Sequence, residues 1–242
     1  MSSTILTKIK TELKLLKRFI HHRLYASGKT RREIVDNFHK LYYGPGDASG
    51  DMPWQNTRWM GIKLFKCPLD LWVYQEILFE VKPDLIVECG TADGGSTLYL
   101  ANLCDIMDKG EIISIDIKER PQIPKHPRIS YLFGSSTSSD IVEKIKNKVS
   151  GYEKILVILD SDHSRDHVLK ELEIYSPIVS IGSYIIVEDS NVNGHPVVSD
   201  FGPGPMEAIF DFMKIVNNFA IDYSREKFLL TQNPNGYLKK VK

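Results

Sequence analysis

The chain has 242 residues, of which 42% are hydrophobic and 26% charged, and this composition is that of an ordinary globular protein. A chain of this length predicts one large α/β domain with an extension. Lysine plus arginine and aspartate plus glutamate both number 31, so the balanced charge excludes the basic footprint of a nucleic-acid-binding protein.

The distribution of cysteine and of apolar residues predicts a cytoplasmic location. Cys67, Cys89 and Cys104 have no metal or redox spacing, and an odd number of such cysteines fits reduced thiols. No stretch approaches the ~20 apolar residues of a spanning helix. The start of the chain also lacks the apolar core and the cleavage site of a signal peptide.

The first 66 residues are predicted to form a helical extension followed by a lid or substrate segment. Between Ile5 and Tyr25 apolar residues recur at helical spacing, with lysines around and opposite them. We expect this helix to dock on the body of the protein or on a second subunit, which favours a homo-oligomer. The alternative is peripheral contact of its basic face with an anionic membrane.

Residues 42–66 are rich in glycine, proline and aromatic residues, including Trp54 and Trp59. A segment too apolar for a loose linker is a candidate lid or wall of a substrate pocket. The equally acceptable interpretation is that both tryptophans only pack against the rest of the protein.

Residues 67–242 are predicted to form the main domain, beginning with a helix over residues 68–81. Buried strands then alternate with helices, which indicates a mostly parallel, doubly wound sheet whose ligands bind outside the carboxyl ends of the strands. Strands are expected at 85–88, 111–116, 128–133, 154–160 and 182–188, and two closing strands near 219–223 and 227–231. Helices are expected from about 95 to 107, over 138–149 and 165–175, and from about 205 to 216.

The turn after the first of these strands predicts a nucleotide-type cradle. Gly90 and Gly94 let the backbone turn sharply and approach a ligand closely. Ser96 and Thr97, with the free N–H groups of the following helix, offer hydrogen-bond donors. The Gly-x-x-x-Gly spacing differs from the Gly-x-Gly-x-x-Gly of dinucleotide sites, which disfavours the alternative of a nicotinamide-dependent oxidoreductase.

The next two strand ends supply further candidates for nucleotide binding. Asp116 ends the second strand, where a carboxylate can accept hydrogen bonds from both hydroxyls of a ribose. The alternative is a solvated turn aspartate. Gly134, Ser135 and Ser136 form a small polar turn after the third strand, placed to flank an adenine ring.

Three carboxylates follow the fourth and fifth strands, namely Asp160, Glu188 and Asp189. Converging carboxylates repel one another unless a cation lies among them, and an all-oxygen set suits Mg²⁺. The alternative is that some of them pair with Arg165 or with lysines. His163 follows Asp160 by three residues and is a candidate general base, although a lone histidine is often only structural.

Taken together, these segments resemble the cephalosporin hydroxylase / rhamnosyl O-methyltransferase family of class I S-adenosylmethionine-dependent methyltransferases. The resemblance covers most of residues 56–242 and leaves out the first forty. The matching segments are Cys67–Gln75, Glu88–Ser96, Leu159–His163, Val187–Pro196, Gly202–Ala208 and Glu226–Leu230.

The resemblance implies a Rossmann-like sheet of seven strands with an antiparallel last strand. It implies S-adenosylmethionine at the turn after the first strand and at Asp116, and Mg²⁺ at Asp160, Glu188 and Asp189. Related catechol-type methyltransferases have a lysine three residues after the first metal aspartate, where this chain has His163. The residues predicted to bind the cofactor are Glu88, Gly90, Thr91, Gly94, Ser96, Asp116, Gly134, Ser135 and Asp160.

We therefore expect a Mg²⁺-dependent O-methyltransferase acting on a hydroxyl of a sugar or glycoside-type small molecule, in lipid or polysaccharide biosynthesis. Asp160 and His163 are the expected catalytic residues, with His163 accepting the proton of the hydroxyl. A second alternative is a non-catalytic protein that binds S-adenosylmethionine and supports another biosynthetic enzyme. The intact group of carboxylates argues against that alternative.

Overall fold

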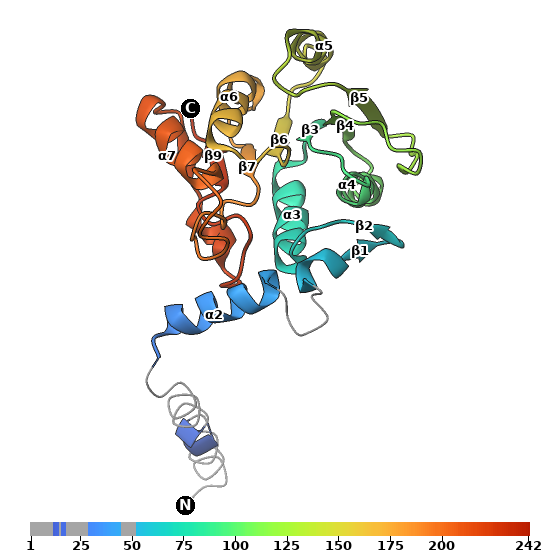
Figure 1. The fold of residues 1–242 in the computed structure, drawn as a ribbon. Helices are drawn as coiled ribbons and strands as arrows, with labels where there is room; N and C mark the ends of the chain where they lie inside the picture. Colours follow the sequence, from blue (N-terminus) through green and yellow to red (C-terminus); the bar gives the residue numbers. More distant parts are fainter. Residues whose placement is uncertain (1–11, 15, 18–28, 45–51) are drawn as a thin grey trace, which may run out of the picture.

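The computed structural model describes residues 12–14, 16, 17, 29–44 and 52–242 (Figure 1). Residues 12–14, 16 and 17 are helical, and the rest of the helix predicted between Ile5 and Tyr25 lies outside the described residues. Within the described ranges every helix is too short or too polar to cross a membrane.

Helix α2 (Arg31–Tyr43), which the sequence analysis did not predict, precedes the main domain and lies along one end of it in Figure 1. It begins with a capping box: the Glu33 N–H donates to Thr30 Oγ1 at 3.2 Å, and Glu33 Oε2 accepts from the Thr30 N–H. The short helix η1 (Pro53–Asn56) and the hairpin of β1 (Arg58–Trp59) and β2 (Ile62–Lys63) follow.

The predicted seven-stranded sheet is confirmed, with the strand order β5-β4-β3-β6-β7-β9-β8. All neighbours from β5 to β7 are parallel, whereas β9 runs antiparallel to both β7 and β8. Because the order reverses between β3 and β6, the ligand crevice is expected there. The strands are β3 (Leu85–Cys89), β4 (Glu111–Asp116), β5 (Ile129–Phe133), β6 (Ile155–Leu159), β7 (Tyr184–Val187), β8 (Phe219–Ile221) and β9 (Tyr237–Lys240).

Helices cover both faces of the sheet, because alternate strand residues point to opposite faces and both sets are apolar. Leu85, Val87 and Cys89 of β3 belong to one core cluster with residues of α5, α6 and α7, whereas Ile86 belongs to a second cluster with α3 and α4. The helices are α3 (Pro68–Val81), α4 (Gly95–Ile106), α5 (Ser139–Val149), α6 (Arg165–Tyr175) and α7 (Pro205–Ile215), with short turns η2 (Ser176–Ile178) and η3 (Tyr223–Glu226).

The closing strand predicted near residues 227–231 is wrong, because this segment is a turn whose first three residues are exposed, and the last strand is β9. Leu229 has φ +75°, a left-handed conformation that no strand residue adopts. The N–H of Gln232 donates to Asp70 Oδ2 at 2.8 Å and that of Asn233 to Thr231 Oγ1 at 3.0 Å. Side chains therefore take the hydrogen bonds that a neighbouring strand would make.

The division of the chain between residues 66 and 67 stays a prediction. Lys66, the last residue of the predicted extension, is only 2% exposed and lies within the main domain.

Candidate active site

A cavity of about 530 Å³ lies at the crevice where the strand order reverses. The turns after β3, β4, β5 and β6 line it, as expected for the carboxyl edge of a parallel sheet. Five of the nine residues predicted to bind the cofactor are among the lining residues, whereas Glu88, Thr91, Gly94 and Ser96 are not. The lining residues are Gly90, Ala92, Ile115, Asp116, Ile117, Arg120, Gly134, Ser135, Ser136, Asp160, Ser161, Asp162 and His167.

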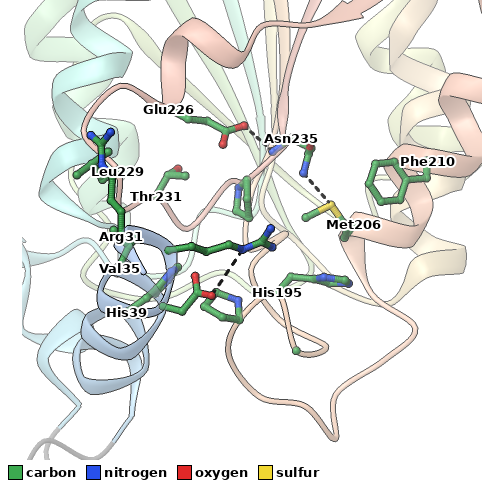
Figure 2. A pocket seen from close by; sticks show the side chains of 15 residues that line it. Arg31, Val35, His39, His195, Met206, Phe210, Glu226, Leu229, Thr231 and Asn235 are labelled. Atoms are coloured by element: carbon green, nitrogen blue, oxygen red, sulfur yellow. Dashed lines mark hydrogen bonds and ion pairs between the residues drawn. The ribbon is translucent and has the colours of Figure 1, made fainter. Parts of the chain in front are cut away.

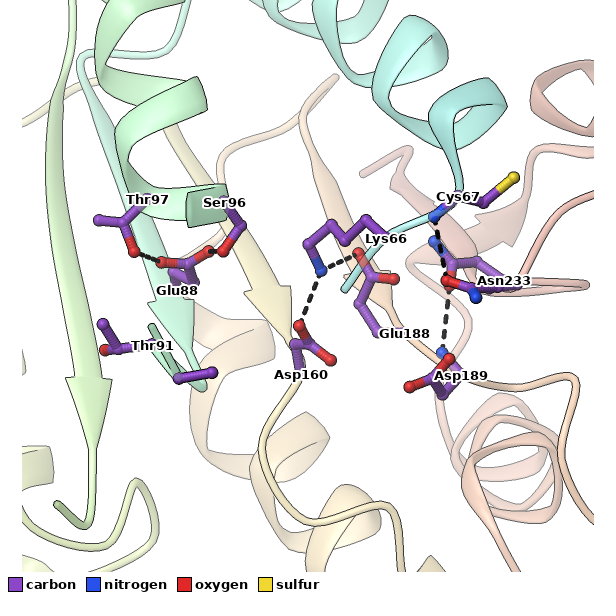
Figure 3. Close-up of polar contacts among 12 residues, drawn as sticks. Lys66, Cys67, Glu88, Thr91, Ser96, Thr97, Asp160, Glu188, Asp189 and Asn233 are labelled. Carbon is purple, nitrogen blue, oxygen red and sulfur yellow. Dashed lines mark hydrogen bonds and ion pairs between the residues drawn. The ribbon is translucent and has the colours of Figure 1, made fainter. Parts of the chain in front are cut away.

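Glu88 is fully buried and is turned away from this cavity toward α4. The Ser96 hydroxyl donates to Oε1 at 2.6 Å, and the Thr97 hydroxyl donates to Oε2 (Figure 3). The Ser114 hydroxyl also donates to Oε2. Burial raises the pKa of Glu88, while these hydrogen bonds oppose the shift. This geometry makes Glu88 a support that joins α4 to β4, and its predicted contact with a cofactor stays a prediction.

Asp116 fastens the turn after β3 to the end of β4. Its Oδ2 accepts hydrogen bonds from the N–H groups of Thr91 at 3.1 Å and Ala92 at 2.9 Å, and its Oδ1 accepts from the Lys118 N–H at 3.0 Å. Thr91 is buried, and its hydroxyl lies 2.6 Å from that of Ser114. Thr91 thus shapes the turn, while Asp116 both shapes it and lines the cavity.

A group of polar side chains lies at the ends of β5 and β6, and the sequence analysis named only Ser136 among its members. Glu171 of α6 is fully buried, and its Oε1 accepts from the hydroxyls of Ser136 and Ser161. His167 Nε2 lies 3.1 Å from Ser136 Oγ. The hydrogen bond between His167 and Glu171 raises the pKa of His167. His167 and Glu171 have the i,i+4 spacing of neighbours on a helix, and this spacing could have predicted their contact from the sequence.

Two of the three predicted carboxylates, Asp160 and Asp189, converge around His163, whereas Glu188 does not belong to this group. His163 Nε2 lies 3.3 Å from Asp189 Oδ2 and 4.0 Å from Asp160 Oδ1. One potential ligand atom from each of Asp160, His163 and Asp189 lies within 4.8 Å of the other two. Burial raises the pKa of Asp189 to about 6. The negative charges of Asp160 and Glu188 also raise this pKa, as expected for crowded carboxylates, whereas His163 lowers it.

Lys66 completes this group and was not predicted. Its Nζ lies 2.7 Å from Asp160 Oδ2 and 2.8 Å from Glu188 Oε1 (Figure 3). Burial by itself lowers the pKa of Lys66, but the two carboxylates raise it above its ordinary value, so the ammonium stays charged. A lysine therefore pairs with two of the three carboxylates, whereas Arg165 contacts Asp211 and Asp166 instead.

Asp160, Glu188 and Asp189 form a carboxylate rim at the ends of β6 and β7. The oxygen atoms of this rim fit a hard divalent cation. Asp160 and Asp189 each keep an oxygen that faces His163, outside the contacts of Lys66. Carboxylate oxygens close together are the ligands that Mg²⁺ prefers, with water and substrate oxygens completing its coordination. The assignment of Asp160, Glu188 and Asp189 as its ligands stays a prediction.

A family model described as Rhamnosyl O-methyltransferase/CmcI matches residues 52–241, which is most of the chain. The chain belongs to the Rhamnosyl O-methyltransferase/CmcI family. The predicted family and enzyme class, an O-methyltransferase, are thereby confirmed.

Curated relatives agree with this Rhamnosyl O-methyltransferase/CmcI membership. The chain is 41% identical over 212 residues to a rhamnosyl O-methyltransferase from Mycobacterium tuberculosis, covering 85% of this chain and 84% of the relative. It is 41% identical over 211 residues to that of Mycobacterium leprae, with coverages of 85% and 90%.

The solved structures share the fold of this family member. An apo structure of CmcI superposes with a TM-score of 0.63 at 23% identity, covering 81% of this chain and 80% of the other. A structure of CmcI with Mg and SAM gives 0.61 at 20% identity, covering 81% of each chain. The predicted Rossmann-like fold is confirmed.

The two tryptophans of the predicted pocket wall have different surroundings in this family member. Trp59 donates from Nε1 to Asn102 Oδ1 at 2.9 Å and meets the Tyr99 ring edge-on at 4.9 Å, so it is a packing residue. Trp54 stacks on Tyr43 with ring centroids 5.1 Å apart. The pKa of Tyr43 is raised by burial and by the negative charges of Asp189 and Asp160.

A second cavity, of about 780 Å³, lies between α2 and the C-terminal part of the chain and is lined by residues of both (Figure 2). Figure 2 shows Arg31 and His39 on one side of it and His195, Met206 and Asn235 on the other. Beside it, His39 Nε2 lies 2.9 Å from Asn191 Nδ2. This contact fastens α2 to the loop that begins at the Asp189 end of the carboxylate rim.

Proposed function

We propose that this protein transfers the methyl group of S-adenosylmethionine to a hydroxyl group of a sugar or glycoside, with the help of Mg²⁺. The observation that carries the proposal is the position of Asp160. This residue lines the cavity at the strand crossover and at the same time belongs to the carboxylate rim. A donor in the cavity and a cation at the rim would therefore be neighbours.

The proposed place of S-adenosylmethionine is the cavity of about 530 Å³. Asp116 is oriented by three backbone N–H groups and is the proposed partner of the ribose hydroxyls. Gly134 and Ser135 are proposed to flank the adenine. Support comes from the relative CmcI, whose structure with Mg and SAM shares this fold, and from the 41% identical rhamnosyl O-methyltransferases.

Asp160, Glu188 and Asp189 are proposed to hold Mg²⁺. When bound, this ion supplies a Lewis acid that lowers the pKa of the acceptor hydroxyl. His163 Nε2 points at the rim and is the proposed acceptor of the hydroxyl proton. The carboxylate of Asp189, whose Oδ2 lies 3.3 Å away, would stabilise the positive charge that the imidazole gains in the transfer.

The Tyr43–Trp54 stack is the proposed wall for the acceptor. Sugar rings have an apolar face that packs on aromatic side chains, and the rings of Tyr43 and Trp54 are stacked on one another. Mycobacterial relatives named for rhamnosyl acceptors support a deoxysugar glycoside as the first compound to test.

The test is transfer of label from methyl-labelled S-adenosylmethionine to a panel of rhamnosides, other glycosides and catechol. We expect labelled glycoside only in the presence of Mg²⁺, and none with Asp160→Asn, although that variant still binds S-adenosylmethionine. Equal transfer in EDTA would remove the cation from the mechanism. Cofactor binding without transfer to any acceptor would favour the non-catalytic alternative.

The cytoplasmic location, the homo-oligomer and the peripheral membrane contact stay predictions. Membrane contact and subunit docking were expected from residues 5–25, most of which lie outside the described ranges.

A further inference from the structure

The buried ammonium group of Lys66 contacts two of the three carboxylates at the rim, Asp160 and Glu188. Lys66 directly precedes α3 and reaches the rim from outside the sheet, 94 residues before its partner Asp160. The next residue fixes its backbone, because the Cys67 N–H donates to the Gln232 side chain at 3.1 Å. Lys66 and Glu188 are each only 2% exposed, so water screens this ion pair little.

When His163 is neutral, as a general base must be, the charges at the rim do not balance without a cation. Asp160, Glu188 and Asp189 bring three carboxylates, and Lys66 brings one ammonium in contact with two of them. The other buried carboxyl groups nearby have their own donors: Ser96, Thr97 and Ser114 for Glu88, and Gln232 and Tyr237 for Asp70. The rim therefore carries an excess of two carboxylates over ammonium groups.

We propose that Lys66 is a built-in counter-ion of the cation site, which leaves the two negative charges that one divalent ion balances. In the metal-free protein it holds Glu188 and Asp160 in place. This inference rests on the proposed Mg²⁺ site. It makes Lys66 a positioning residue, and no proton transfer is assigned to it.

The physical reason is the cost of burying charge. A buried carboxylate without a counter-charge is strongly unfavourable, and removing one partner of a buried ion pair destabilises far more than removing an exposed one. Without Lys66, Glu188 would be a buried, unpaired carboxylate whenever no cation is bound. The folded protein would then depend on Mg²⁺ for its stability.

The first experiment compares melting temperatures of the full chain in EDTA and in Mg²⁺. In EDTA, Lys66→Met is expected to melt on the order of 10 °C below the unaltered protein. Added Mg²⁺ should raise the melting temperature of the variant more than that of the unaltered protein. The matched control is Lys109→Met, which removes an exposed pair with Asp84 at 2.9 Å and should shift melting by about 2 °C or less.

A second variant separates a charge effect from a packing effect. Lys66→Met combined with Glu188→Gln removes both charges while keeping both side-chain volumes. In EDTA this double variant should melt well above Lys66→Met alone, because the buried carboxylate is gone. If Lys66 only filled space, the two substitutions would lower the melting temperature additively. That result would overturn the inference, and the comparison also covers the case in which Lys66→Met alone does not fold.

The response of the unaltered protein distinguishes the two proposals. If Mg²⁺ leaves its melting temperature unchanged at millimolar concentration, the cation site is wrong and the inference fails with it. If Mg²⁺ stabilises the unaltered protein but Lys66→Met loses no stability in EDTA, or gains no more from Mg²⁺, only the inference about Lys66 is overturned.

Discussion

Gly90 lies directly against the backbone of Asp160. A Cβ atom built on Gly90 would lie 1.8 Å from the carbonyl oxygen of Asp160, and the Asp160 N–H donates to the Cys89 carbonyl at 2.7 Å. The turn proposed to hold the methyl donor and the first carboxylate of the rim are therefore one structural unit. Any side chain at position 90 would push the two apart.

The first prediction follows from this contact. Gly90→Ala combines a backbone clash with a φ of +103°, so we expect a loss of at least ~3 kcal/mol in the free energy of unfolding, measured by urea titration. Gly151→Ala is the control, because nothing lies within 4 Å of a Cβ there, and it should change stability by ~0.5 kcal/mol or less. Equal stability of both variants would contradict the close approach.

A second prediction concerns the proposed base. His163→Gln should lower kcat by ~10²–10⁴-fold, because no group at the rim then accepts the hydroxyl proton. The dissociation constants of S-adenosylmethionine and Mg²⁺ should stay within about twofold of the unaltered values, since the carboxylates remain. Calorimetry and initial rates measure these quantities. His126→Gln, which removes a 2.9 Å contact with Asp105 on the surface, is the control, and an unchanged kcat in His163→Gln would exclude the assignment.

The two tryptophans give a third prediction. Trp54→Ala should raise the KM of the acceptor about tenfold with little change in the KM of S-adenosylmethionine, because a stacking wall is lost. Trp59→Ala should lower the free energy of unfolding by ~3 kcal/mol and leave the acceptor KM of the folded fraction unchanged, since this side chain packs on Tyr99. The reverse pattern would place the acceptor elsewhere.

The fourth prediction is a dependence of stability on pH through His39. Burial lowers the pKa of His39 to about 4 from its ordinary 6.5, although Asp36 opposes the shift. The folded state thus favours the neutral imidazole, and its contribution is present above pH 6.5 and is lost as the pH falls toward 4. Between pH 8 and pH 5 the loss from this group is about 2 kcal/mol.

Urea unfolding at these two pH values measures this loss. Other groups also titrate over the range, so the quantity to compare is the difference between the unaltered protein and His39→Gln. The variant should lose about 2 kcal/mol less than the unaltered protein on acidification. Equal losses would show that His39 is not held neutral by the fold.

The parts of the fold that the sequence predicted depend on local patterns. The apolar runs of β3 and β6 are buried on both faces, so their composition indicated strands of a parallel sheet. The segment at 227–231 misled the analysis, because Phe228, Leu229 and Leu230 form a short apolar run like that of a strand, whereas Leu229 takes a left-handed turn. Helix α2 was missed, although Thr30 and Glu33 have the spacing of a capping box.

The site could be predicted only where the topology determines it. Asp160, Glu188 and Asp189 follow neighbouring parallel strands, so their approach follows from the sheet itself. Lys66 precedes α3 and has no strand to place it, so its contact with Asp160 is a long-range packing result that no local pattern encodes. The different surroundings of Trp54 and Trp59 likewise depend on tertiary contacts, with Tyr43 for Trp54 and with Asn102 for Trp59.

The most direct test of the account is a crystal structure with S-adenosylhomocysteine and Mn²⁺, which replaces Mg²⁺ and scatters anomalously. The account predicts one strong anomalous peak within coordination distance of Asp160, Glu188 and Asp189, with the homocysteine sulfur in the adjacent cavity beside Gly90. An anomalous peak away from these carboxylates, or the nucleoside bound outside the cavity at the crossover, would contradict it.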